Sequence, residues 1–262
     1  MYFDLADQHR AGDSPIHRLD PRVKVLLAVL FILTVSLTPF AAFGAYAALW
    51  AVVMATVLLA RIEPGYLLRR SAVAFPFALA AVTLPFTIPG EPLLRLPIWG
   101  GLTLSVEGTL RFASILVKSW ISVQMAIILV TVTSFPDLLW GLRALRVPQP
   151  LIAIVGFMYR YLFVLADEVL RMLRARSARS ATAPGRRSGG TLWWRGKVAG
   201  RMAGSLMIRS LERSERIYSA MLARGYRGEM QLLAPPHLQR SDVMVLAGAL
   251  VLLATILVGS YY

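Results

Sequence analysis

Cysteine is absent from this chain of 262 residues, which excludes disulfides, thiolate metal sites and cysteine nucleophiles. Histidine is nearly absent: His9, His17 and His237 are scattered and lie outside the apolar stretches. The sequence contains no Walker A phosphate-binding motif and no pair of carboxylates spaced for acid–base chemistry. We therefore expect no catalytic residues, no metal site and no cofactor in this chain.

Charged residues make up only 16% of the chain, whereas a soluble domain usually has about a quarter. The deficit is concentrated in long apolar stretches, and Phe40–Ala60 has 21 residues without a charge. That length can cross about 30 Å of hydrocarbon. An all-α, polytopic membrane protein is therefore expected, not a soluble protein with apolar core helices. Because Asp4, Asp7 and Asp13 precede the first apolar run, we expect no cleavable signal peptide.

Five apolar stretches are predicted to span the membrane: Val23–Leu37, Phe40–Ala60, Ser71–Ile88, Phe112–Val132 and Val243–Gly259. Residues 89–104, rich in proline and glycine, are expected to form an external loop. Ser134 is expected to cap a short helix that ends near Arg146. Long helices are predicted over residues 151–181 and 192–225, with a linker at 183–190, and Ser241-Asp242 is expected to cap the last span.

Positive charge is concentrated in one segment of the chain. Of the 28 lysines and arginines, 15 lie between Asp167 and Arg240, against 5 acidic residues. In a membrane protein such a block marks a cytoplasmic segment, and it also meets anionic lipid head groups. The net charge of +14 therefore requires no nucleic acid as a partner.

The same rule predicts the topology, with the N-terminus in the cytoplasm. If the apolar stretch Leu151–Ala166 crossed the bilayer, the basic block would lie outside, and Arg160 would sit in mid-span at a cost of a few kcal/mol. We therefore expect this helix to pack on protein or to lie at the interface. The prediction is five spans in the cytoplasmic (inner) membrane, divided into residues 1–132 with four spans, a cytoplasmic coupling domain of long basic helices at 133–240, and residues 241–262 with the last span.

Two short segments of the basic block repeat the pattern Ala-x-x-Ala-Arg-(Ser/Gly), each near the end of a predicted helix. Their small residues form a smooth helix face that allows close approach of another helix. The adjoining arginine adds a fork of donors suited to a carboxylate. An arginine- and alanine-rich helix can also produce such a match by chance, and Arg176 competes with Arg179 in the first copy. The predicted docking residues are Ala178, Arg179, Ser180, Ala223, Arg224 and Gly225.

Other charged residues are given structural roles. Asp167 and Glu168 are expected to pair with Arg171 at i+4 and i+3. Arg213 and Arg216 are expected on a solvated helix face, with pairs such as Glu212–Arg216. Lys118 is the one charge within the predicted span Phe112–Val132, which alone is weak support for a secondary transporter.

Three stretches resemble the transmembrane T component of energy-coupling factor transporters, in its cobalt-type, CbiQ-like branch. They are Ser14–Leu26 (SPIHRLDPRVKVL), Met158–Arg171 (MYRYLFVLADEVLR) and Arg209–Tyr226 (RSLERSERIYSAMLARGY). The resemblance covers nearly the whole chain, and the last stretch is the most specific. Ser180 departs from the family's usual Ala-Arg-Gly motif, so the register of the first motif is less secure.

The resemblance implies a coupling protein and not an enzyme. It implies that Arg179 and Arg224 each dock into a groove on one of two cytoplasmic ABC ATPases. It also implies that a separate membrane subunit, the substrate-binding S subunit, captures the metal. Cobalt is the expected cargo, with nickel or a vitamin as alternatives. A function of a different class, a membrane-embedded lipid-modifying enzyme, would need clustered acidic or histidine residues, and the sequence shows none.

Overall fold

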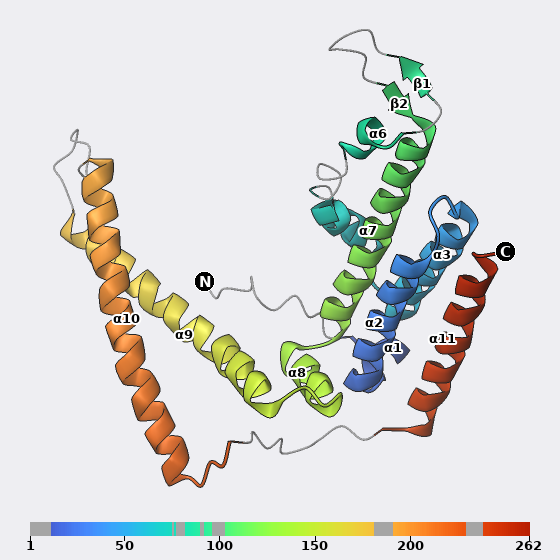
Figure 1. The fold of residues 1–262 in the computed structure, drawn as a ribbon. Coiled ribbons are helices and arrows are strands. Elements are labelled where there is room, and N and C mark those ends of the chain that lie inside the picture. The colour runs from blue at the N-terminus through green and yellow to red at the C-terminus, as the bar shows by residue number, and fades with distance from the viewer. Residues whose placement is uncertain are drawn as a thin grey trace. The chain divides into compact units, whose positions relative to one another are not determined.

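The computed structural model describes residues 12–74, 76, 82–89, 92–95, 103–180, 191–228 and 238–262. These residues form two compact units (Figure 1). We call the described residues up to Leu145, together with 238–262, the bundle unit. Residues 146–180 and 191–228 form the two-helix unit. The predicted division into membrane and cytoplasmic parts stays a prediction.

The bundle unit is built almost entirely of helices. Its helices are α1 (Pro15–Arg18), α2 (Pro21–Leu37), α3 (Phe43–Ala60), α4 (Pro64–Arg70), a 3-10 turn η1 (Ser71–Ala74), α6 (Leu84–Thr87), α7 (Val106–Val132), α8 (Phe135–Ala144) and α11 (Arg240–Gly259). Strands β1 (Pro92–Arg95) and β2 (Thr103–Ser105) pair antiparallel within the segment expected as an external loop. The two-helix unit consists of α9 (Gln149–Arg179) and α10 (Leu192–Ala223). The predicted all-α class is confirmed.

Helix starts follow local capping chemistry. The Asp20 carboxylate accepts from the N–H of Arg22 (2.8 Å), and Pro21 begins α2 where no N–H is required. The Ser134 hydroxyl accepts from the N–H of Asp137, so the predicted cap of α8 is confirmed.

The expected cap of α11 needs a correction. The helix begins at Arg240, so Ser241 and Asp242 lie inside its first turn. The Asp242 carboxylate reaches back to accept from the N–H of Gln239 (3.0 Å). Capping therefore comes from the third helical residue, one half of a capping box, and Gln239 is the cap position.

The core of the bundle unit lies between α2, α3 and α7, with a contribution from α11. Its centre contains side chains with almost no exposure: Phe31, Val35, Tyr46, Leu49, Val53, Val57 and Ile121. Tyr46 donates from its hydroxyl to the carbonyl of Pro39 (2.7 Å). Trp50 stacks on Trp120, whose indole N–H donates to the Ser71 hydroxyl (3.0 Å). The polar groups of Tyr46 and Trp120 are thus satisfied.

Lys118, the one charge of the predicted span Phe112–Val132, has a structural explanation. Its ammonium donates to the carbonyls of Thr38 (2.6 Å) and Ser36 (3.1 Å) at the end of α2. It also lies 4.8 Å from the centre of the Phe40 ring. Carbonyls at a helix end have no partner within the helix, so a cation there satisfies them and interacts favourably with the helix dipole.

Contacts between helix ends distinguish the two sides of the bundle unit. Tyr261, just after α11, donates to the carbonyl of Leu37 (3.0 Å), so α2 and α11 end at the same side. The early part of α7 lies at that side too, because the Ser114 hydroxyl accepts from the N–H of Ala41 (3.0 Å). At the other side, Gly141 of α8 packs on the backbone of Pro21. The chain therefore leaves the bundle unit after α8 at the side where α2 and α11 begin.

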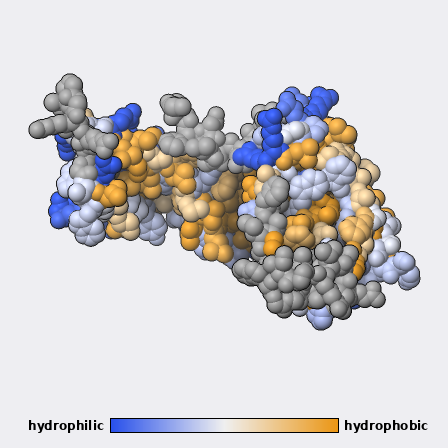
Figure 2. Space-filling view, turned by 90° about the horizontal axis from the view of Figure 1, so that it is seen from above, coloured by the Kyte–Doolittle hydropathy of each residue, from blue (hydrophilic) through white to orange (hydrophobic). Residues whose placement is uncertain are grey.

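Four helices of the described residues are long and apolar enough to cross a membrane: α3, α7, α9 and α11. The first predicted span is α2, which has 17 residues. Of the third predicted span, residues 75 and 77–81 lie outside the described residues, and its described ends are η1 and α6. Large hydrophobic side chains are exposed on the helices, such as Leu58 (69%) and Val251 (65%). Figure 2 shows orange, hydrophobic areas on the viewed face beside blue, hydrophilic ones, as expected of a multi-pass membrane protein.

Candidate docking sites at the ends of two long helices

The two-helix unit is formed by α9 and α10, of 31 and 32 residues. At 1.5 Å per residue, each helix is about 47 Å long. Pro150 stands in the first turn of α9, where a missing N–H costs nothing. Thr191 caps α10, since its hydroxyl accepts from the N–H of Trp194 (3.3 Å). The sequence thus specifies two unusually long helices.

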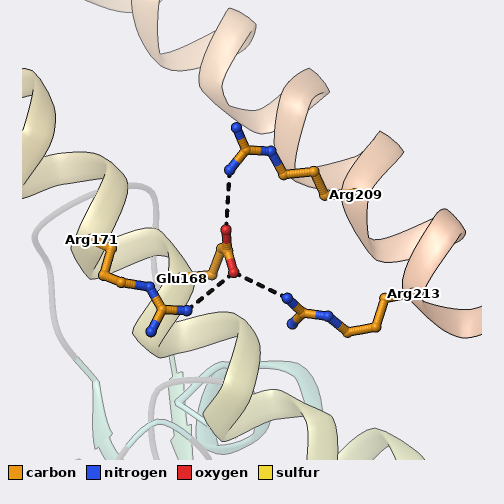
Figure 3. A network of polar contacts seen from close by, with 4 residues as sticks. All are labelled: Glu168, Arg171, Arg209 and Arg213. Atoms are coloured by element: carbon orange, nitrogen blue, oxygen red, sulfur yellow. Dashed lines mark hydrogen bonds and ion pairs between the residues drawn. The ribbon is translucent and has the colours of Figure 1, made fainter. Parts of the chain in front are cut away.

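A single carboxylate joins the two helices. Glu168 of α9 accepts from Arg171 on the same helix (3.1 Å) and from Arg209 (3.1 Å) and Arg213 (3.2 Å) of α10. Figure 3 shows the carboxylate pointing between the three guanidinium groups. Glu168 lies beyond the apolar stretch Leu151–Ala166 of α9. Hydrogen bonds from Arg171, Arg209 and Arg213 hold the pKa of the Glu168 carboxyl below its ordinary value.

This cluster confirms one sequence prediction and corrects another. Glu168 and Arg171 form the expected i, i+3 pair. Arg213 does not belong to a solvated face, because it contacts Glu168 of the other helix. Arg216 donates to the backbone carbonyl of Glu212 (3.4 Å) and not to its carboxylate. Side-chain spacing within one helix could not reveal a partner on the other helix.

A mostly apolar groove runs between α9 and α10, with a volume of about 620 Å³. Phe157 and Tyr161 line it from α9, and Ile217 and Tyr218 line it from α10. Arg213 lies at its wall, where it is already paired with Glu168. The groove accounts for one apolar face of the first half of α9, whereas Leu151, Met158 and Leu162 lie outside it and are exposed.

The carboxyl end of α10 closes in a Schellman motif. The N–H of Tyr226 donates to the carbonyl of Met221 (3.0 Å). The N–H of Gly225 donates to the carbonyl of Leu222 (2.9 Å). Gly225 has φ 81°, a left-handed conformation that strains residues with a Cβ. Gly225, the last residue of the second motif, is therefore glycine because of its backbone conformation. Arg224 is the helix cap and is exposed directly before this turn.

The carboxyl end of α9 is built differently. Ser180 is the cap, and both its N–H (3.0 Å) and its hydroxyl (2.9 Å) donate to the carbonyl of Arg176. Arg179 is the last helical residue and is exposed. The two motif arginines thus stand one position apart relative to their helix ends, although both motifs fall at helix ends as predicted.

The structure also separates the two candidates in the first motif. The guanidinium of Arg176 lies 6.0 Å from the centre of the Trp194 ring on α10. Within the described part of the chain, Arg179 and Arg224 have no hydrogen bond or ion pair from their side chains. Ala178 and Ala223 beside them are exposed. Arg176 therefore has an internal contact, whereas Arg179 and Arg224 are presented outward.

The two motifs are not brought together. The start of α10 is near the end of α9, as the contact between Trp194 and Arg176 shows. Arg224 stands at the opposite end of α10, about 48 Å along its axis. This geometry offers two separate attachment points. Across the described ranges, no group of three or more His, Asp or Glu side chains could hold a metal ion.

The sequence matches the family of cobalt transport proteins named CbiQ over residues 12–233. The chain belongs to the CbiQ family. The cobalt transport protein CbiQ of Rhodobacter capsulatus is 32% identical over 166 residues, which are 63% of this chain and 65% of that relative. This match therefore spans just under two thirds of the relative's length.

Matches to other relatives extend over most of both chains. The energy-coupling factor transporter transmembrane protein EcfT of Brevibacillus brevis is 28% identical over 229 residues, 84% of each chain. EcfT of Ruminiclostridium cellulolyticum is 26% identical over 269 residues, covering 97% of this chain and 96% of the relative. The resemblance noted from three stretches of sequence is confirmed, and the CbiQ-family match includes both arginine motifs and the Glu168 cluster.

Sequence analysis missed Glu168 as the contact between the long helices. A signal was present, since Glu168 lies in one stretch that carries the family resemblance and Arg209 and Arg213 lie in another. An acidic residue in one family stretch and arginines in another are candidates for a contact. Periodicity within a helix does not use that information.

Proposed function

We propose that this chain is the transmembrane coupling (T) component of an energy-coupling factor importer. In this role it joins two cytoplasmic ABC ATPases to a separate substrate-binding membrane subunit. Relatives named cobalt transport protein and energy-coupling factor transporter transmembrane protein support the assignment. The CbiQ relative favours cobalt as the cargo. Nickel or a vitamin is the alternative, because the proposal assigns cargo selection to the other membrane subunit.

The observation that carries the proposal is that the two motif arginines are exposed and unpaired among the described residues. Arg179 and Arg224 are exposed at the ends of long helices, next to exposed alanines, and neither is paired with another described residue. Elsewhere in the same unit, Arg171, Arg209 and Arg213 share one carboxylate. Arginines left unpaired beside a smooth helix face are suited to a carboxylate on another protein.

The topology of the bundle unit supports a cytoplasmic position for the two-helix unit. The chain leaves the bundle after α8 and returns at α11 on the side where α2 begins. A single crossing by α9 would leave the chain on the wrong side for α11. A return through α10 is disfavoured because that helix contains six Lys or Arg and two Glu residues. We infer that α9 does not cross, and that this side is cytoplasmic by the positive-inside rule.

The same topology bears on the third predicted span. α3 ends near the start of α2, since Ala60 and Ile62 line a small cavity with Ser14 and His17. The early part of α7 lies at the other side, near Ala41. The end of α3 and the start of α7 therefore lie on opposite sides of the bundle unit. This supports five crossings with the N-terminus in the cytoplasm and the inner membrane as the location.

Mechanically, the two helices act as levers that meet at Glu168. Movement of the two ATPases would shift Arg179 at the end of α9 and Arg224 at the end of α10, which are two separate attachment points. The Glu168 cluster would keep α9 and α10 moving together and pass the movement to a subunit bound on them. Such motion of packed helices is of the hinge or shear kind.

The test is the double replacement Arg179→Ala with Arg224→Ala. The two ATPases should no longer co-purify with the chain, and cobalt uptake by cells should be lost, while the chain stays folded in the membrane. Both sites are changed together because two attachment points can mask each other through effective concentration. An arginine–carboxylate pair across an interface can be worth about 2–5 kcal/mol when one partner is removed.

The matched control removes two other exposed arginines, Arg174→Ala with Arg216→Ala, and should retain the ATPases. Arg224→Lys should restore co-purification in part, because an ammonium cannot form the bidentate fork. Arg176→Ala tests the alternative register of the first motif, in which Arg176 and not Arg179 would bind the ATPase; a larger loss of co-purification than with Arg179→Ala would favour Arg176. Full retention of ATPases and transport by the Arg179/Arg224 double variant would reject the docking role.

A further inference from the structure

The first turn of α10 exposes an unusual group of large apolar side chains. Leu192 is 85% exposed, Trp193 is 84% exposed and Trp194 is 44% exposed. These three residues are consecutive and begin a 32-residue helix. Contiguous apolar surface of this kind, with polar residues around it, marks a site of interaction with a protein or a membrane.

The group is held in a fixed orientation. Thr191 caps the helix through the N–H of Trp194 (3.3 Å), so the helix begins at Leu192 with defined geometry. The ring of Trp194 also lies under the guanidinium of Arg176 from α9, 6.0 Å from its centre. Trp193 therefore projects from an ordered turn.

Two cations continue the same face of α10. Lys197 lies one turn after the tryptophans, and Arg201 lies one turn further along. Both side chains are exposed, and within the described residues neither has an ion pair. The opposite face is the half-buried one toward α9, with a helical spacing: Met202, Leu206, Ser210, Arg213, Ile217 and Met221. The face of Trp193, Lys197 and Arg201 is thus turned away from α9.

The charge of this outward face changes along the helix. Its first half has Lys197 and Arg201 and no acidic residue, whereas Glu212 and Glu215 occupy the second half. An anionic surface would therefore attract the first half more strongly than the second, where exposed Arg216 lies beside the two glutamates. The second half leads to Arg224, the proposed docking residue. The two halves of one helix therefore fit two different partners.

We propose that the start of α10 is a membrane anchor, with Trp193 and Trp194 in the head-group region of the bilayer and Lys197 and Arg201 on anionic phospholipids. Tryptophan is enriched at membrane interfaces because its ring is apolar and its N–H is polar. Lysine and arginine place their stems along apolar surface while their charges reach lipid phosphates. A polar protein surface would pair with the cations but would leave the tryptophans exposed.

We favour the bilayer as the partner of this surface because the chain is a multi-pass membrane protein and is therefore always in contact with lipid. The anchor would keep the start of α10 at the membrane surface, whereas Arg224 lies at the far end of the helix. The proposal rests on the cytoplasmic side of the two-helix unit and not on the docking of Arg179 or Arg224. Loss of ATPase binding would therefore leave it intact.

The test uses the absence of cysteine from the chain. Leu192→Cys in the full chain is labelled with an environment-sensitive fluorophore and reconstituted in nanodiscs, alone and with its ATPases and substrate-binding subunit. Nitroxide-labelled lipids should quench the label at 192, with a shift of its emission to shorter wavelength, while aqueous iodide should have little effect. The quenching should be stronger with phosphatidylglycerol than with phosphatidylcholine alone.

The control is Ser219→Cys, exposed in the second half of α10 on the face of Lys197 and Arg201, where iodide should quench and lipids should not. Lys197→Glu with Arg201→Glu should abolish the preference for phosphatidylglycerol. Iodide quenching at 192 in both lipids would overturn the anchor. Protection from both quenchers only in the assembled complex would assign this surface to a protein partner instead, and equal lipid quenching in both lipids would refute the role of the two cations.

Discussion

The bundle unit and the two-helix unit bury their side chains to very different extents. The bundle unit has a core whose centre is inaccessible to solvent, with Leu49 and Val53 at 0% exposure. In the described part of the two-helix unit, Ala153 is the one buried residue of α9, and α10 has none. Among the described residues, packing stabilises the first unit, whereas the contacts between the helices of the second include the Glu168 cluster and the Arg176–Trp194 pair. A unit with so little core of its own is suited to being covered by partners.

The contrast predicts opposite effects of the same substitution, and glycine to alanine is the sharpest version. A Cβ at Gly108 of α7 would lie 2.7 Å from the carbonyl oxygen of Leu84 and 2.8 Å from Cα of Pro85. Backbone atoms cannot move aside cheaply, so Gly108→Ala should destabilise the bundle by about 1–3 kcal/mol. Thermal unfolding of the purified chain in detergent measures this.

The counterpart is Gly204→Ala on α10, where a Cβ would meet nothing within 4 Å. Alanine should stabilise that helix by up to about 1 kcal/mol, because glycine is a poor helix former. Equal losses at the two positions would show that the units are packed alike.

Gln124 is an exception within the bundle unit. The side chain is 0% exposed, and neither its amide nitrogen nor its oxygen has a hydrogen-bond partner in the described chain. An unpaired buried polar group costs about 1–3 kcal/mol, so Gln124→Leu should raise the unfolding temperature. Ser114→Ala is the control, because that hydroxyl is paired with the N–H of Ala41 and its loss should lower the temperature. A lower temperature for Gln124→Leu would reveal a hidden partner.

The smallest expected effect concerns pH in the two-helix unit. Because arginines hold the pKa of Glu168 below its ordinary value, its contribution is present above the ordinary glutamate pKa, about 4, and is lost as pH falls through the lowered value. Spin labels at Leu173→Cys and Met207→Cys should report a fixed separation of α9 and α10 near neutrality and a broader distribution in acid.

Glu168→Gln should give the broad distribution at every pH. Glu212→Gln, at an exposed glutamate of α10, serves as the control and should leave the separation unchanged. A narrow distribution in acid for the unsubstituted chain would mean that the helices are joined by something other than this carboxylate.

Long apolar and basic stretches were sufficient to predict most helices. The predicted helices at residues 151–181 and 192–225 have ends within two residues of those of α9 and α10. Each segment has about 30 residues without a helix-breaking turn, which favours one long helix. Helix ends were also readable where a cap is chemically specific, as at Ser134. The cap of α11 was misplaced because Ser241 and Asp242 are of residue types that often cap helices. The helix instead begins at Arg240, directly after Gln239.

Contacts between helices were not predictable in the same way. Lys118 and Arg213 both looked unpaired or solvated in sequence, yet one caps α2 and the other binds Glu168 across the two-helix unit. Their partners are 80 and 45 residues away in sequence. Periodicity reports which side of a helix a residue occupies but not what faces it. The pairing of the two arginine motifs with ATPases stays a prediction for the same reason, since the partners are on other chains.

The most direct test of the account places a photo-crosslinking residue beside each proposed docking arginine in the assembled transporter. Exposed Ser177 and Leu222 flank Arg179 and Arg224, and Leu58, 69% exposed on α3, is the control. Irradiation should join positions 177 and 222 to the ATPases and should leave position 58 without an ATPase product. Absence of ATPase products at both 177 and 222, in a complex that still transports, would contradict the claim that the two long helices end in docking sites.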